Sequence, residues 1–170
     1  MALASLLDEA LEAWQYVRTG VLREIENLSP ADLAFRPHPD SRTVTEIAFH
    51  IAQSGAMMAG ELTNPDGDFT RKHYLQILKE HSRGVRPMRR KSEIVRQLKR
   101  THADGARKIR AAGEMRMLQL IAQFDGERRS RLTWMHHGIA HEEYHRGQIA
   151  LYARLRGRVP ALTQLIYGKT

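Results

Sequence analysis

Hydrophobic side chains recur at helical spacing along four long stretches of the chain, and no stretch alternates as a half-buried strand would. In the first stretch one face carries Leu7, Ala10, Trp14, Val17, Val21 and Ile25. The predicted long helices run from about Leu3 to Leu28, from Ser41 or Thr43 to about Leu62, from just after Ser92 to Gly113, and from roughly Glu127 to Arg156. A short helix is expected around His73–His81.

Several predicted helix ends carry recognisable end signals. Thr43 is followed three residues later by Glu46, which is the pattern of a capping box. Gly157 follows the last predicted helix, and Pro160 prevents that helix from continuing. The connector before the fourth helix ends at a turn made by Asp125 and Gly126. We expect these connectors to contain no strands.

Four long amphipathic helices predict an all-α fold, an up-and-down four-helix bundle with a longer crossover connection. The length suits one domain, which we expect to span residues 1–170. No apolar run approaches the about 18 residues of a membrane helix, so no membrane partner is expected. The N-terminus carries the early acids Asp8 and Glu9 and reads as a helix, not a signal peptide. We expect a cytoplasmic protein.

The composition narrows the chemistry that the chain can perform. The sequence contains no cysteine, which excludes disulfides, thiolate ligands and a cysteine nucleophile. Any bound metal must therefore be held by histidine, aspartate, glutamate or water. The net charge of +8 is concentrated between Arg83 and Lys91. Because no aromatic residue is interleaved there, nucleic-acid binding is not expected. A solvated basic loop is expected instead, with a binding patch for phosphate or an acidic ligand as the alternative.

The fourth predicted helix carries the main candidate site. Heptad steps along one seam give Trp134, Gly138, His141, His145, Gln148, Tyr152 and Leu155. His141 and His145 are four residues apart and point the same way, which is the spacing of a helical clamp for a divalent metal. Imidazoles on a core-facing seam could instead be hydrogen-bonded core residues or line a pocket. His50, on the apolar arc of the second helix, could lie opposite the pair.

Three neighbours of the histidine pair are candidates for a supporting role. Gln148 could hydrogen-bond a ligand or water, or pack at the edge of the seam, and Glu142 could orient an imidazole. His137, one turn before His141, is a candidate for the pocket or the surface. The sequence His-Glu-x-x-His also matches the zinc-peptidase helix, but no acidic residue follows Glu143 to supply a downstream third ligand. A peptidase is therefore not expected.

Two segments resemble the DinB/YfiT-like family of metal-binding four-helix bundles. They are Thr43–Ala52, with the sequence TVTEIAFHIA, and His141–Ile149, with the sequence HEEYHRGQI. The ending Leu155–Pro160, LRGRVP, is similar to that of the family as well. The resemblance implies that His50, His141 and His145 together bind a divalent metal, and it adds His50 to the pair that helical spacing selects. It also implies a homodimer.

The same resemblance implies a function. Characterised relatives include transferases that use low-molecular-weight thiols such as bacillithiol or mycothiol, and a maleylpyruvate isomerase. We therefore expect a metal-dependent transferase or hydrolase that activates a low-molecular-weight thiol or water at the three-histidine site and acts on a small molecule. Zinc or nickel is the first expectation for the metal, followed by iron or manganese. The alternative is a non-catalytic, metal- or ligand-binding stress- or DNA-damage-inducible protein.

Overall fold

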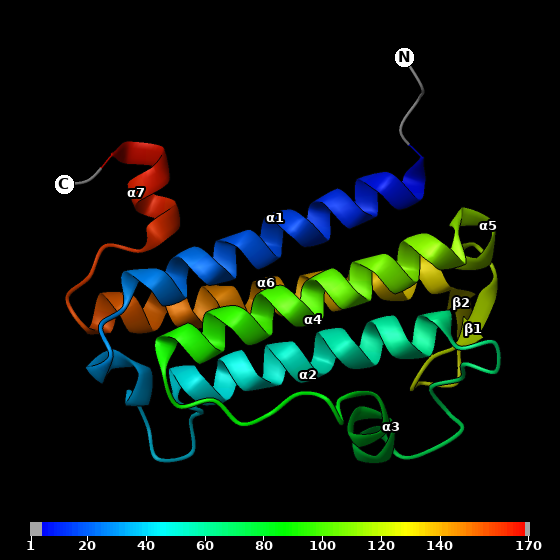
Figure 1. Cartoon of the computed structure of the whole chain (residues 1–170), viewed down its shortest axis with the longest axis horizontal. Helices are drawn as coiled ribbons and strands as arrows, with labels where there is room; N and C mark the ends of the chain where they lie inside the picture. Colours follow the sequence, from blue (N-terminus) through cyan, green and yellow to red (C-terminus); the bar gives the residue numbers. More distant parts are fainter. Residues whose placement is uncertain (1–4, 169–170) are drawn as a thin grey trace.

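Four long helices form the bundle in the computed structural model, which describes residues 5–168 (Figure 1). They are α1 (Leu6–Asn27), α2 (Val44–Thr63), α4 (Lys91–Ala112) and α6 (Arg131–Leu155). The shorter elements are a 3-10 helix η1 (Ala31–Ala34), α3 (Tyr74–His81), α5 (Glu114–Met117), the strands β1 (Leu120–Ala122) and β2 (Arg128–Ser130), and α7 (Ala161–Tyr167). None of these helices has the length and apolar character needed to cross a bilayer. The all-α bundle prediction is confirmed.

The crossover joins α2 to α4 and sets the direction of the helices. Figure 1 shows α2 and α4 running the same way, whereas α1 and α6 run in the opposite direction. The connecting segment includes α3 and passes along one side of the bundle. Within the bundle α2 packs against α4 and α6, and α1 packs against the same two helices. The parallel α2–α4 pair is therefore a product of the long connection, since a short loop joins only antiparallel neighbours.

The predicted cap of α2 fixes the start of the helix that carries His50. Thr43 Oγ1 accepts from the backbone N–H of Glu46 at 3.2 Å, and the Glu46 carboxylate accepts from the N–H of Thr43 at 2.7 Å. The other end of α2 is tied to α6, because the buried Arg131 guanidinium donates to the carbonyl oxygen of Leu62 at 2.8 Å. The two helices that supply the histidines are thus aligned at one end by side-chain to backbone bonding.

A buried carboxylate anchors the crossover to the bundle. Glu61 is fully buried on α2 and accepts from Arg71 at 2.7 Å and from His81 at 2.6 Å. Its other oxygen also accepts from the backbone N–H of Asp68 at 2.8 Å. These bonds hold α3 beside α2, which positions Tyr74 next to the middle of the bundle.

The core is divided into two apolar halves by a polar layer. One half is centred on Trp14, Leu62 and Met135, and the other on Ile25 and Ile47. Between the halves, the inward positions of each long helix carry polar side chains in place of apolar ones. The polar layer consists of Arg18 on α1, His50 on α2, Thr101 and His102 on α4, and His141, Glu142 and His145 on α6. Polar groups in a bundle interior need partners, so this layer is where a site is to be sought.

The connections differ from the sequence prediction in two places. β1 and β2 form an antiparallel hairpin in which Leu120 pairs with Ser130, and α6 therefore begins at Arg131, four residues after the predicted start. Strands of three residues are too short to show alternation, and Gly126, at φ 83°, makes the turn between them. Beyond Pro160 the chain forms α7, which the sequence did not predict because its apolar side chains stay exposed.

Candidate metal centre

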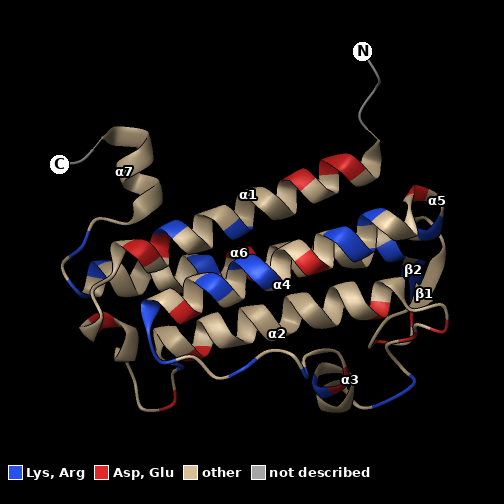
Figure 2. Cartoon of the chain, in the orientation of Figure 1, with Lys and Arg blue, Asp and Glu red and all other residues tan. Residues whose placement is uncertain are grey.

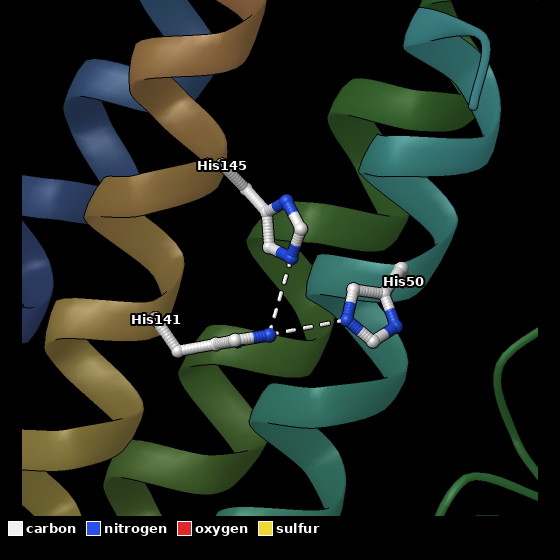
Figure 3. A group of neighbouring side chains, drawn as sticks. All are labelled: His50, His141 and His145. Carbon is white, nitrogen blue, oxygen red and sulfur yellow. Dashed lines mark hydrogen bonds between the residues drawn. The ribbon is translucent and has the colours of Figure 1, made fainter. Parts of the chain in front are cut away.

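Three imidazoles from two helices converge in the polar layer. Nε2 of His141 lies 3.2 Å from Nε2 of His50 and 3.1 Å from Nε2 of His145 (Figure 3). Three nitrogens bound to one tetrahedral zinc at about 2.0–2.1 Å are separated by roughly 3.3 Å. The spacing of these donors therefore fits a single divalent ion without a change of helix positions. One potential ligand atom from each residue lies within 4.8 Å of the other two.

Burial keeps the three imidazoles neutral. His145 is buried, His50 is half-buried and His141 is partly exposed. Burial is the largest cause that lowers the pKa of each ring, and the positive charge of Arg42 adds to it. The pKa of His50 falls to about 3. Neutral imidazoles keep a lone pair for a metal ion, so this environment favours ligation over protonation.

Gln148 fixes the orientation of one ring. Nδ1 of His145 donates to Oε1 of Gln148 at 2.7 Å, so the lone pair of this neutral ring lies on Nε2. That nitrogen is the one that faces His141. A residue one turn further along α6 thus selects the tautomer that a metal requires. Gln148 was expected to hydrogen-bond a ligand or water, whereas its partner in the structure is the imidazole of His145.

Glu142 belongs to the polar layer but, within the part of the chain that the structure describes, it makes no hydrogen bond to an imidazole, contrary to the expectation that it orients one. Its carboxylate forms a buried ion pair with Arg18 and also accepts from Nε1 of Trp14 at 3.0 Å. Arg18 donates as well to Thr101 at 3.2 Å. The carboxylate therefore joins α6 to α1 and α4. A general base of the zinc-peptidase kind needs a carboxylate that is free to take up a proton, whereas the Glu142 carboxylate is paired with Arg18.

A mostly apolar pocket of about 240 Å³ opens beside the histidines. His141 lies in its lining, and Ser54, also in the lining, has its hydroxyl oxygen 3.5 Å from Nε2 of His50. The walls come from both the bundle and the connectors: Met57, Met58, Tyr74, Phe124, Trp134 and His137. His137 lies in the lining of this pocket.

The aromatic wall is the part of the site that the sequence did not reveal. The centroid of the Phe124 ring, at the tip of the hairpin, lies 5.5 Å from the ring centroid of Tyr74 on α3. It lies 5.5 Å from that of Trp134 on α6 as well. Phe124 and Trp134 are neighbours in sequence, whereas Tyr74 comes from the distant crossover. Their meeting depends on how the crossover packs and on the hairpin, and the sequence predicted the helix of the crossover but neither its packing nor the hairpin.

The basic segment Arg83–Lys91 takes no part in this pocket. Figure 2 shows basic residues gathered along α4 and on the connector before it. A separate open hollow is lined by Arg86, Arg89, Arg96 and Arg100, and within the described residues it shares no lining residue with the pocket beside His141. An anionic ligand of the histidine site would therefore need another cation.

Comparison with solved structures gives the same fold at low sequence identity. A DinB-like protein from Bacillus cereus is 16% identical, with 89% of this chain and 93% of that chain covered and a TM-score of 0.67. YfiT from Bacillus subtilis, described as a probable metal-dependent hydrolase with an unusual four-helix bundle topology, is 14% identical, with 92% and 91% covered and a TM-score of 0.69.

A mycothiol-dependent maleylpyruvate isomerase is 10% identical and has a TM-score of 0.67, with 86% of this chain and 63% of that chain covered. A search of curated proteins finds no match. The DinB family model matches residues 3–167, which is nearly the whole chain. The matched range contains all four bundle helices, including the two that carry the histidines. The chain is a member of the DinB family.

Proposed function

We propose that this protein is a divalent-metal-dependent enzyme that activates a low-molecular-weight thiol or water for attack on a small molecule. His50, His141 and His145 are the proposed ligands, and zinc or nickel is the first candidate metal, followed by iron or manganese. The observation that carries the proposal is the convergence of three neutral imidazole nitrogens beside an apolar pocket. Three protein ligands leave a coordination position for a reactant, as in catalytic zinc sites.

The bound metal would supply Lewis acidity that lowers the pKa of a coordinated thiol or water. The chain's own residues would supply the remaining requirements. Gln148 holds His145 in the ligating tautomer, and the pocket walls hold an apolar reactant next to His141 while they exclude water. Because the sequence contains no cysteine, the sulfur of a thiol reaction must come from a second small molecule.

The relatives of this fold support both branches of the proposal. YfiT is described as a probable metal-dependent hydrolase, and the isomerase is described as mycothiol-dependent. A hydrolase needs an activated water, and a thiol-dependent enzyme needs an activated sulfur. One three-histidine centre can serve either reaction, and the reactant that enters the pocket decides between them.

Two measurements test the proposal. The first is elemental analysis of protein purified without a histidine tag, alongside the double variant His141→Ala/His145→Ala and the control His136→Ala, which changes an exposed histidine on the same helix. We expect near-stoichiometric metal in the wild type and the control, and loss of metal in the double variant. Equal metal content in all three proteins, or none after metal is added back, would overturn the site.

The second measurement is turnover by the metal-loaded protein. Hydrolysis of 4-nitrophenyl acetate reports on activated water, and consumption of 4-nitrobenzyl chloride with added 3-mercaptopropionate reports on an activated thiol. We expect at least one rate to depend on His50, His141 and His145. Bound metal without turnover in either assay would favour the non-catalytic, metal-binding alternative.

A further inference from the structure

The histidine group is flanked by two hollows of different character. The first is the apolar, aromatic pocket beside His141. The second is a more open hollow of about 500 Å³ whose lining mixes charged, polar and apolar residues and includes His50, Arg42 and Gln53. Tyr74 lines both hollows, so they adjoin at this residue. A reaction between two small molecules requires a place for each of them beside the reacting centre.

Arg42 gives this second hollow a positive charge that no direct ion pair neutralises within the described residues. Its side chain is exposed and makes no hydrogen bond or ion pair with any residue between positions 5 and 168. Two carboxylates share this lining, and the charge of Arg42 acts on that of Glu46, but neither forms a direct ion pair with Arg42. Glu46 faces Arg36 at 3.3 Å and caps α2, and Asp40 faces His38 at 3.5 Å.

The other arginine of the hollow provides a direct contrast. Arg36 donates to both oxygens of Glu46, at 3.3 and 3.4 Å, and to the carbonyl oxygen of Pro39 at 3.2 Å. Its charge is neutralised within the protein. Arg42 sits one residue before the cap of α2, in the same hollow as His50, with all five guanidinium N–H donors available to a ligand.

The apolar pocket, unlike the hollow that contains Arg42, favours an uncharged ligand. A cavity of about 150 Å³ lined by aliphatic and aromatic side chains accommodates benzene. The pocket beside His141 measures about 240 Å³, so it has room for a substituted single ring. Its walls offer Met57, Met58 and three aromatic rings but no cationic side chain. A charged group would lose hydration there without gaining a partner.

We propose that Arg42 binds the carboxylate of an anionic thiol reactant at the histidine site, and that the aromatic pocket binds an uncharged, ring-sized second reactant. This inference rests on the proposed function and adds the class of each reactant. Guanidinium and carboxylate groups pair through two parallel hydrogen bonds, which Arg42 is free to form. The basic segment Arg83–Lys91 is not required, because it lines a different hollow.

The test uses cobalt(II)-loaded protein, since thiolate binding to cobalt produces a charge-transfer absorption band that is independent of turnover. The probes are 3-mercaptopropionate and its uncharged amide, 3-mercaptopropionamide. We expect the wild type to bind the carboxylate about fivefold more tightly than the amide. Arg42→Gln should remove this preference, whereas Arg42→Lys should keep part of it. Arg36→Gln is the matched control and should leave the preference unchanged.

Each outcome separates this inference from the proposed function. If the protein does not take up cobalt, the proposed function fails and this inference falls with it. If cobalt binds but both thiols bind equally well to the wild type, the proposed function stands and the role of Arg42 is overturned. That role is overturned as well if Arg42→Gln keeps the preference, because the carboxylate would then be recognised by another group.

Discussion

Gln148 and His145 are joined by a 2.7 Å hydrogen bond in which the imidazole Nδ1 donates to the amide oxygen. Because Gln148 lies three residues after His145 on α6, the bond is made within one turn of the helix. It is local to α6, and it leaves Nε2 of the ring free to face His141. The helix that presents two of the proposed ligands also sets the tautomer of one of them.

Gln148→Leu should weaken metal binding about 10-fold or more, because loss of a hydrogen-bond partner behind a histidine ligand typically costs 10–100-fold in affinity. The measurement is a competition titration of zinc against a chromogenic chelator. Gln15→Ala, which changes an exposed glutamine on α1, is the control and should leave the affinity unchanged. Unchanged affinity in Gln148→Leu would show that the Nδ1 bond is not needed for ligation.

Glu142→Gln should destabilise the fold by about 3–5 kcal/mol, since the substitution leaves the Arg18 guanidinium buried without its counter-charge. Urea denaturation of the metal-free protein measures this loss. Glu12→Gln, at an exposed position of α1, should change the free energy of unfolding by less than about 0.5 kcal/mol. A small loss in Glu142→Gln would mean that the polar layer rearranges around a neutral partner.

Gly105→Ala should destabilise the protein by about 1–3 kcal/mol, despite the higher helix propensity of alanine. An added Cβ at this position of α4 would lie 2.6 Å from the Trp14 ring and 3.0 Å from the Cβ of Ala59. Gly147→Ala is the matched substitution in α6, where a Cβ would meet nothing within 4 Å. It should stabilise the protein by about 0.5–1 kcal/mol. Urea midpoints of the two variants should therefore move in opposite directions.

Acidification should destabilise the metal-free protein between about pH 6.5 and pH 4. Burial lowers the pKa of His102 to about 4 and that of His50 to about 3, whereas the same residues in the unfolded chain titrate near 6.5. In this window the unfolded state binds more protons, so stability is present above the unfolded pKa and is lost as the pH falls. Each histidine that stays neutral contributes about 1.4 kcal/mol per pH unit.

His102→Phe isolates one of these contributions. The ring of His102 packs on Trp14 with centroids 4.5 Å apart, and its Nε2 is buried without a hydrogen-bond partner within the described part of the chain. Phenylalanine keeps an aromatic ring there and removes the titrating group. The slope of unfolding free energy against pH should fall by about 1.4 kcal/mol per unit over this window. A slope equal to that of the wild type would contradict the assigned pKa shift.

The residues that lie on regular helices were largely predictable from the sequence. Spacing selected His141 and His145, resemblance added His50, and the seam pointed to Gln148. The partner of Glu142 was missed, although Arg18 follows Trp14 and Val17 on the inward side of α1, where a charged residue is itself a signal. Phe124 and Tyr74 could not be placed, because their positions depend on a hairpin of three-residue strands and on the packing of the crossover.

One part of the pocket wall stands on a different kind of backbone from the proposed metal ligands. The imidazoles stand on α2 and α6, whereas Tyr74 and Phe124 stand on connections between bundle helices. Connections tolerate insertion and exchange far better than packed helices do. A descendant of this chain could therefore acquire a new substrate range by altering the crossover or the hairpin while its reactive centre stayed in place. The same separation makes these two connections natural places to graft new selectivity.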